Sequence, residues 1–229
     1  KYPDFTSPGK PDIDPNYFFH ILSGQLSAKS IVCVDVGQIQ MWAAQSLRIT
    51  KSQRFLTEGG MASIGSALPM AIGASFAKPG LPVVVIAGDG GFQLNIQELQ
   101  TLYHHHLPVK IILLNNNGYG MIKQFQEQYL DSRFQSSGVG YSNPDFQAVV
   151  SAYKIPSMKI SCNGEISAAL KQLFSDMHPG FLEVIIDKES RVLAKLAVNR
   201  PVEDQEPFMD REELRSNMII EMLPEPDKP

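Results

Sequence analysis

Two runs dominated by apolar residues, Val83–Ala87 and Lys110–Leu114, constrain the fold of this chain more than any other feature. Runs of this kind are typical of strands that are buried on both faces of a parallel sheet. Between them, residues 95–106 carry apolar side chains at helical spacing. A helix of this length can connect two parallel strands. The pattern therefore predicts a strand–helix–strand unit in the middle of the chain.

The same alternation of strand-like and helix-like segments extends over most of the sequence. Further strands are expected at residues 31–36, 157–160 and 181–186. Further helices are expected after Pro15, where Asp14 is a suitable N-cap, and at residues 38–47, 64–77, 146–153 and 165–177. Strands that alternate with helices predict an α/β fold, a three-layer sandwich in which helices flank a mostly parallel central sheet.

The length of the chain fits one such domain with a tail. Its 229 residues are enough for an α/β domain with a buried core. Residues 1–14 are rich in proline and polar side chains and are interpreted as a linker. Residues 15–190 are assigned to the domain, and residues 191–229 to an extended C-terminal tail with one short helix near 211–216. Because the sequence begins with Lys rather than Met, we expect a processed chain or a piece of a longer protein, and we favour the piece.

Composition argues against several classes of function. The formal net charge of −4 gives no electrostatic reason to expect nucleic acid or an anionic membrane as a partner. No stretch approaches the roughly 18 consecutive apolar residues of a membrane span. Cys33 and Cys162 stand far apart without metal-ligand spacing, so neither a zinc site nor a disulfide framework is indicated. Successive residues of His104–His106 point about 100° apart on a helix, which favours a solvated helix end over a metal site.

The chemistry is concentrated between residues 88 and 120. Asp89 follows the first apolar run, and Asn116 follows the second. Because parallel strands end at the same edge of a sheet, where open α/β folds bind ligands, both side chains are expected to converge there. A carboxylate, an amide carbonyl and the backbone carbonyl of Gly118 are oxygen ligands that suit Mg²⁺, which proteins often hold together with phosphate groups. The sequence therefore predicts a magnesium site at this edge.

Glycines beside the aspartate are expected to approach phosphate. Gly88, Gly90 and Gly91 lack side chains, and the following helix offers its N-terminal N–H groups. Two other phosphate motifs do not fit, because Gln93 takes the place of the third glycine in GxGxxG and no GxxxxGK[ST] occurs. Asp-Gly and Asn-Gly also form ordinary turns. Their joint occurrence at consecutive strand ends favours a metal-bound diphosphate.

The Gly-Asp-Gly motif at Asp89, followed by the double Asn115-Asn116, resembles the cofactor motif of thiamine-diphosphate (ThDP) enzymes. Residues 36–45 and 55–69 resemble the C-terminal, diphosphate-binding domain of acetolactate synthase large subunits and their relatives. The resemblance extends from Pro15 to Asp187. Its metal motif is highly specific for the cofactor and much less specific for the substrate.

The resemblance implies a role for each matching position. Asp89, Asn116 and the carbonyl of Gly118 would hold Mg²⁺. The Ala62 carbonyl would meet the 4′-amino group of the pyrimidine ring, and Ile64 would be the apolar wedge that bends the cofactor. The implied cofactor-binding positions are Gly37, Gln38, Ala62, Ser63, Ile64, Gly88, Gly90, Gly91, Tyr119, Gly120 and Met121.

The implied chemistry needs a second domain. In the bent cofactor the 4′-imino nitrogen acts as a base toward the thiazolium C2, and general-base catalysis contributes about 10²–10⁴-fold. The carbanion would attack a 2-keto acid, release carbon dioxide and add to an acceptor carbonyl, while the protein orients the cofactor. In this family a Glu of a pyrimidine-binding domain protonates the cofactor ring, and this chain contains neither. The implied partner is that domain, from the same or another chain of a homodimer or tetramer.

Four positions depart from the acetolactate synthase pattern. Ile39 stands where His is common, Ile64 replaces Met, and Glu58 replaces Ser. Phe125 lies where those synthases usually carry a Trp that shapes the acceptor pocket. Phe125 is therefore the predicted substrate-pocket residue, and the acceptor is expected to differ from that of a standard branched-chain pathway enzyme.

Three functions stay open at the level of sequence. The leading one is the cofactor-binding half of a ThDP- and Mg²⁺-dependent, cytoplasmic carboligase (a transferase or lyase) that decarboxylates a 2-keto acid. The second is a ThDP-dependent decarboxylase or carboligase with another acceptor, such as a keto-sugar. The third is a cofactor-binding module that is inactive alone. FAD is compatible only with a longer protein that has a middle domain.

Overall fold

The computed structural model describes residues 9, 11–196 and 200–224. The chain divides into two compact units, Lys1–Ser190 and Arg191–Pro229. Residues 1–8 and 10 of the predicted linker lie outside the described residues. All predicted site residues belong to the first unit, which contains the α/β fold.

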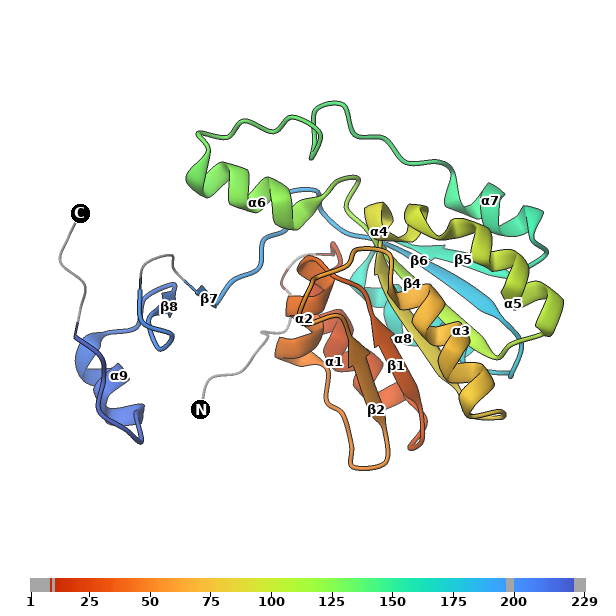
Figure 1. The fold of residues 1–229 in the computed structure, drawn as a ribbon, viewed down its shortest axis with the longest axis horizontal. Helices are drawn as coiled ribbons and strands as arrows, with labels where there is room; N and C mark the ends of the chain where they lie inside the picture. Colours follow the sequence, from red (N-terminus) through yellow and green to blue (C-terminus); the bar gives the residue numbers. More distant parts are fainter. Residues whose placement is uncertain (1–8, 10, 197–199, 225–229) are drawn as a thin grey trace. The chain divides into compact units, whose positions relative to one another are not determined.

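A parallel sheet of six strands forms the centre of the first unit, in the order β2-β1-β3-β4-β6-β5 (Figure 1). The interior strands β3 and β4 are buried along almost their whole length, as their continuous apolar runs require. The strands are β1 Ile31–Val34, β2 Arg54–Thr57, β3 Val83–Gly88, β4 Val109–Asn115, β5 Ser157–Ile160 and β6 Gly180–Ile185.

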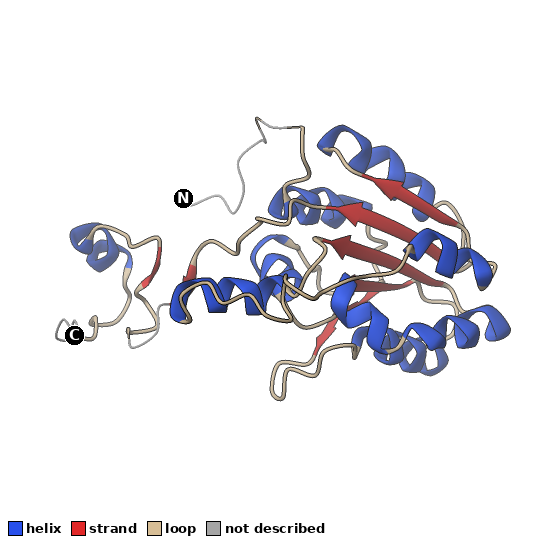
Figure 2. Ribbon diagram, turned by 90° about the horizontal axis from the view of Figure 1, so that it is seen from above, coloured by secondary structure: helices blue, strands red, loops and turns tan. Residues whose placement is uncertain are grey.

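Helices cover both faces of this sheet (Figure 2). On one face, α3, α5 and α7 pack against alternate strand residues such as Cys33, Val85 and Ile111. On the other face α1, α2 and α8 pack together and against the sheet. The predicted three-layer α/β sandwich is confirmed. The helices are α1 Pro15–Gln25, α2 Gln38–Ser46, α3 Ala67–Ala77, α4 Asp89–Leu94, α5 Leu99–His105, α6 Gly120–Tyr129, α7 Phe146–Ala152 and α8 Ile166–Leu173.

The segment between β3 and β4 differs from the single helix predicted for residues 95–106. A short helix, α4, begins at Asp89 directly after the strand and ends before Asn95, whose φ of −131° interrupts the helix. One 3₁₀ turn, Ile96–Glu98, then leads into α5. The apolar spacing identified the second helix, but the glycine-rich sequence of α4 gave no helical pattern. Asp89, the predicted metal ligand, therefore lies within a helical turn.

The second unit adds structure to the predicted tail. Strands β7 Lys195–Leu196 and β8 Gln205–Glu206 pair antiparallel, and α9 covers Arg211–Asn217. Asp204, which is buried, pairs with Arg200 at 3.4 Å and with Arg211. In the part of the chain that the structure describes, no helix combines the length and apolar character needed to cross a membrane.

Candidate functional site

The path of the chain through the sheet reverses between β1 and β3. From β1 the chain moves to the edge strand β2, returns to β3 on the other side of β1, and continues to β4. Open parallel sheets bind ligands at such a switch point, beyond the carboxyl ends of the strands. A pocket lies there, lined by Val36, Gly37, Gln38, Ile39, Trp42, Ile64, Gly88, Asp89, Gly90, Gly91, Leu114, Asn116, Gly118, Tyr119, Gly120, Met121, Ile122 and Ile186.

Most positions predicted to bind the metal or the cofactor line this pocket. The exceptions are Ala62 and Ser63, which lie in the exposed loop before α3. Ala62 has a φ of 53°, an uncommon conformation for a residue with a side chain. Ile64, 39% exposed, projects from the same loop into the pocket lining. The loop therefore presents the predicted wedge to the pocket, while Ala62 is exposed and lies outside the pocket lining.

Asp89, Asn116 and Gly118 bring three oxygen atoms together. Asn116 Oδ1 lies 2.8 Å from the Gly118 carbonyl oxygen and 3.2 Å from Asp89 Oδ1. Turning the Asn116 amide by 180° would put its nitrogen in that place, as a donor to both oxygens. The orientation of this one amide therefore decides whether the cluster consists of oxygens alone.

A chain of hydrogen bonds favours the all-oxygen orientation. Gln38 Nε2 donates to the Ser190 carbonyl at 3.0 Å and to Gln124 Oε1 at 3.1 Å. A backbone carbonyl can only accept, so the nitrogen of Gln38 is fixed on that side. Gln38 Oε1 then faces Asn116 and accepts from its Nδ2 at 3.1 Å. If the Asn116 amide were turned, its Oδ1 would lie 3.1 Å from Gln38 Oε1, and two acceptors would face each other. Asn116 Oδ1 therefore belongs to the cluster.

The oxygen cluster fits a hard cation such as Mg²⁺. Adjacent ligands of an octahedral Mg²⁺, each at about 2.0–2.1 Å from the ion, lie about 3 Å apart. The separations of 2.8 and 3.2 Å in the cluster are close to this value. Among the described residues no group of three or more His, Cys, Asp or Glu side chains could hold a metal ion. The cluster therefore supplies one charge and two neutral oxygens, which leaves room for diphosphate oxygens.

The second carboxylate oxygen of Asp89 is occupied within the protein. Asp89 Oδ2 accepts from the Tyr141 hydroxyl at 2.7 Å, the Gly118 N–H at 3.0 Å and Asn143 Nδ2 at 3.2 Å. Asp89 is only 1% exposed, and burial raises its pKa above the ordinary 3.8 although these hydrogen bonds oppose the rise. Burial and the adjacent negative charge also raise the pKa of Tyr141. The tyrosine hydroxyl therefore stays protonated and donates.

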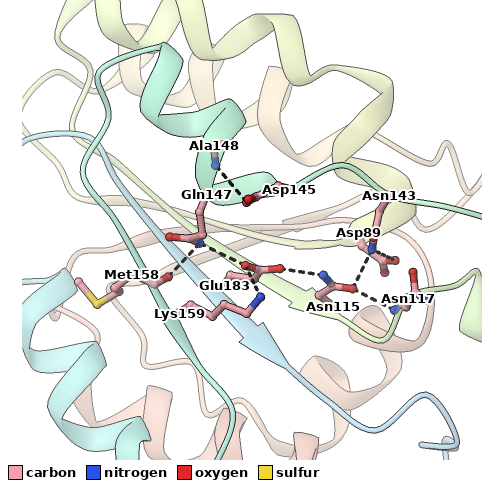
Figure 3. Close-up of polar contacts among 10 residues, drawn as sticks. All are labelled: Asp89, Asn115, Asn117, Asn143, Asp145, Gln147, Ala148, Met158, Lys159 and Glu183. Atoms are coloured by element: carbon pink, nitrogen blue, oxygen red, sulfur yellow. Dashed lines mark hydrogen bonds and ion pairs between the residues drawn. The ribbon is translucent and has the colours of Figure 1, made fainter.

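Asn143 connects this cluster to a buried glutamate of β6 (Figure 3). Its Nδ2 also donates to Asn115 Oδ1 at 3.0 Å, and Asn115 Nδ2 donates to Glu183 Oε1 at 2.8 Å. Glu183 is 3% exposed and accepts from Gln147 Nε2 at 3.2 Å. These bonds fix the loop before α7 to the carboxyl end of the sheet.

Three predicted glycines lie where the backbone has no room for a side chain. A Cβ atom at any of them would come closer than 3.0 Å to a neighbouring side chain, whereas one at Gly88 would meet nothing within 4 Å. The three glycines and the side chains that their Cβ atoms would meet are Gly90 and Tyr119, Gly91 and Asp35, and Gly120 and Gln38. Close packing inside the protein therefore requires glycine at these positions.

Asp35 is a site residue that the sequence did not reveal. It follows β1, is 1% exposed, and accepts from the Gly65 N–H at 2.9 Å. Its Oδ1 also accepts from the Val36 N–H at 2.8 Å. Burial raises its pKa, while hydrogen bonds from the backbone of Val36, Gly65 and Ser66 oppose the rise. Asp35 therefore fixes the loop that carries Ile64 to the end of β1.

Gln38 reaches the pocket in a way that the sequence could not specify. The nitrogen of its side chain is already engaged by Gln124 and Ser190. The N-cap of α2 is Gly37, with a φ of 132° and no side-chain cap. The N–H groups in the first turn of a helix lack partners within the helix and carry its positive end. The Gln38 amide is therefore engaged within the protein, and the start of α2 lines the pocket.

Phe125 is outside the lining of the pocket. It lies on α6 and is 52% exposed, and its ring packs against that of Tyr129 with the centroids 4.7 Å apart. The substrate role predicted for Phe125 therefore stays a prediction, which the lining of this pocket does not support. Trp42 is buried and also lines the pocket.

Tyr141 and Asn143 also escaped the sequence interpretation. Both lie in the irregular segment between α6 and α7, where no periodic pattern marks them. The one local signal is Asp145, which caps α7 by accepting from the Ala148 N–H at 3.1 Å. Recognising this cap defines where the loop ends, but the contact of Tyr141 with Asp89 spans 52 residues and depends on the tertiary fold.

Comparison with known protein families gives one clear match. Residues 35–184 match the family described as thiamine pyrophosphate enzyme, C-terminal TPP binding domain. The matched residues begin at Asp35 and include the oxygen cluster, strands β3, β4 and β5, all but the last residue of β6, and the loop that contains Tyr141 and Asn143.

Curated relatives agree with this match. The acetolactate synthase isozyme 2 large subunit of Escherichia coli (strain K12) is 39% identical over 75% of this chain and 31% of its own length. The acetolactate synthase large subunit of Lactococcus lactis subsp. lactis (strain IL1403) is 36% identical over 84% of this chain and 33% of its length. The chloroplastic acetolactate synthase 2 of Zea mays is 34% identical over 80% of this chain and 30% of its own length. The chain thus spans about a third of these relatives.

Proposed function

Because the chain belongs to the thiamine pyrophosphate enzymes, as their C-terminal TPP binding domain, we propose that its pocket binds the diphosphate of ThDP through Mg²⁺. Thiamine pyrophosphate and ThDP are the same cofactor. The observation that carries the proposal is the cluster of three oxygens from Asp89, Asn116 and Gly118 at the switch point of the sheet. We further propose that the complete enzyme is a 2-keto acid decarboxylating carboligase of acetolactate-synthase type.

Each part of the pocket then has a task. Asp89, Asn116 and the Gly118 carbonyl hold the cation, and the cation holds the diphosphate. The first turn of α2 offers backbone N–H groups to the same anion. Ile64 supports the bend between the two cofactor rings, because its loop is fixed by Asp35. When bound, the cofactor supplies the carbanion that attacks a carbonyl carbon.

The proposal assigns the substrate to surfaces beyond this chain. The chain spans about a third of its acetolactate synthase relatives, so a pyrimidine-binding domain with a catalytic Glu is the proposed partner, within a homo-oligomer. A different acceptor, such as a keto-sugar, is the second candidate, supported by Phe125 in place of the usual Trp. FAD belongs to the proposal only for a protein with a middle domain. We predict a cytoplasmic location and negligible turnover by residues 1–229 alone.

Ligand-induced stabilisation tests the proposed site. Mg²⁺ and ThDP together, at about 100 times the dissociation constant, should stabilise the protein by about 2.7 kcal/mol. Asp89→Ala removes the charged ligand and should abolish this shift in thermal unfolding. The control His105→Ala, at the end of α5, should be stabilised by Mg²⁺ and ThDP as much as the parent. A response of Asp89→Ala equal to that of the parent would contradict the proposed metal site.

A further inference from the structure

The two oxygens of the Asp89 carboxylate have different surroundings. Oδ1 belongs to the cluster with Asn116 Oδ1, at 3.2 Å, and the Gly118 carbonyl. Oδ2 accepts three hydrogen bonds, from Tyr141, Gly118 and Asn143. A carboxylate oxygen has about two lone-pair sites, so three donors saturate Oδ2. Only Oδ1 remains for a metal ion.

The two side-chain donors are themselves held in place. The Tyr141 ring packs edge-on against Tyr119, with the centroids 5.0 Å apart, and its oxygen also accepts from Gln93 Nε2 at 3.2 Å. Asn143 is bound to Asn115, which in turn is bound to Glu183 of β6 (Figure 3). Neither donor can leave Asp89 without breaking a second contact. The geometry of the carboxylate is therefore set by the loop between α6 and α7.

The number of oxygens that a carboxylate offers matters for the choice of cation. Ca²⁺ takes six to eight oxygens at about 2.3–2.6 Å and readily accepts a carboxylate through both of its oxygens. Mg²⁺ requires six oxygens at about 2.0–2.1 Å in near-ideal octahedral geometry, and a carboxylate that binds it through one oxygen fits this geometry. A carboxylate with one oxygen blocked therefore favours the smaller ion.

We propose that Tyr141 and Asn143 are positioning residues that keep Asp89 a one-oxygen ligand and so select Mg²⁺ over Ca²⁺. This inference rests on the proposed function, because it assumes that the oxygen cluster holds a divalent cation. It assigns a role to a loop of which no residue lines the pocket. It also accounts for the different surroundings of the two carboxylate oxygens, since Oδ2 is held by Tyr141 and Asn143 and Oδ1 lies beside Asn116.

The ratio of two dissociation constants tests this proposal. Mg²⁺ and Ca²⁺ would each be titrated calorimetrically into the full-length protein with saturating ThDP. Loss of a group that orients a metal ligand typically costs about 10–100-fold in affinity. The double variant Tyr141→Phe/Asn143→Ala leaves the Gly118 N–H as the one remaining donor to Oδ2. Its Mg²⁺ binding should weaken about 10-fold, while Ca²⁺, which can use the freed lone pair of Oδ2, should lose far less. Each single variant leaves two donors on Oδ2 and should act in the same direction more weakly.

Controls separate selectivity from general damage. Tyr103→Phe removes a hydroxyl from α5, outside the Asp89 cluster, and should leave both constants unchanged. Equal losses for the two ions in the double variant, or no loss of Mg²⁺ affinity, would overturn the proposal. If that variant fails to fold, Tyr141→Phe/Asn143→Leu removes the same two donors and keeps the volume of both side chains. Failure of the proposed function is distinguishable, since then the parent itself would bind neither ion or Asp89→Ala would bind like the parent.

Discussion

At the scale of single residues, Gln38 shows what a sequence motif can and cannot reveal. The resemblance to the ThDP enzymes implied that Gln38 binds the cofactor, and its side chain lines the pocket. Its contacts with Gln124 and Ser190 lie 86 and 152 residues away, so no local pattern encodes them. The same holds for Tyr141 and Asn143, which come from an irregular loop. Sequence motifs identified the residues of the oxygen cluster, but the neighbours that orient them are known only from the fold.

Gly91 provides a prediction at the same scale. A Cβ at Gly91 would meet the Asp35 carboxylate, which is fixed by backbone hydrogen bonds and cannot easily move. Gly91→Ala should therefore lower the free energy of unfolding by about 1–3 kcal/mol, as overpacking of a buried site does. Gly73→Ala is the matched control, since Gly73 lies inside α3 with nothing within 4 Å of its Cβ.

Urea denaturation measures the free energy of unfolding of both variants. Gly73→Ala should raise the free energy of unfolding by about 0.5–1 kcal/mol, because alanine is the better helix former. A Gly91→Ala protein as stable as the parent would show that the end of β1 and α4 are not packed as described.

At the scale of elements, the sequence predicted the interior of the sheet better than its edges. The interior strands β3 and β4 were found because burial on both faces requires apolar runs. The edge strand β2 was missed, since it is half exposed and its Arg-Phe-Leu-Thr sequence has neither a run nor an alternation. Helix α6 was missed as well. Its apolar residues Ile122, Phe125 and Tyr129 recur at helical spacing but are exposed, and Gln124 is its one buried residue. The sequence of α6 therefore carried a helical signal that the prediction overlooked.

The burial of β1 predicts the reactivity of its cysteine. Cys33 is fully buried in this strand, and burial raises the pKa of its thiol to about 12. The thiolate, which is the reactive form, is therefore scarce at neutral pH. Cys162 lies in a half-buried position outside the sheet. Under native conditions N-ethylmaleimide should modify Cys162 and spare Cys33, whereas in denaturant both should react, as peptide mapping by mass spectrometry can show. Rapid native labelling of Cys33 would contradict the position of β1.

At the scale of the whole molecule, two aspartates should make opposite contributions to stability as pH changes. Burial raises the pKa of Asp35 above 3.8, so the folded state binds the proton more tightly than the unfolded state. The contribution of Asp35 to the free energy of unfolding is greatest below its pKa in the unfolded state. It falls as pH rises through its pKa in the folded state. A hydrogen bond from Lys110 lowers the pKa of Asp176. The contribution of Asp176 to the free energy of unfolding is present above its pKa in the unfolded state. It is lost as pH falls through its pKa in the folded state.

Urea denaturation from about pH 3 to pH 7 separates these effects. The stability of the parent minus that of Asp35→Asn should decrease as pH rises, and the corresponding difference for Asp176→Asn should increase. Asp176 is exposed, so the stability difference between the parent and Asp176→Asn should change less with pH than the difference for Asp35→Asn. Parallel slopes for the two variants would contradict the burial of Asp35. The pH dependence of stability would then give no evidence that the Asp35 carboxylate is buried.

The weak attachment of α6 has a consequence for motion. This helix contributes one buried side chain, and Lys123 ties it to Glu189 through an exposed ion pair at 2.8 Å. Segments with so few buried contacts open locally at a low cost in free energy, whereas a central strand such as β4 opens only with the whole domain. Amide hydrogens of α6 should therefore exchange with deuterium long before those of β4. Because Gly120 and Met121 of α6 line the pocket, and Gln38 is hydrogen-bonded to both Gln124 and Asn116, a bound cation and diphosphate should slow that exchange.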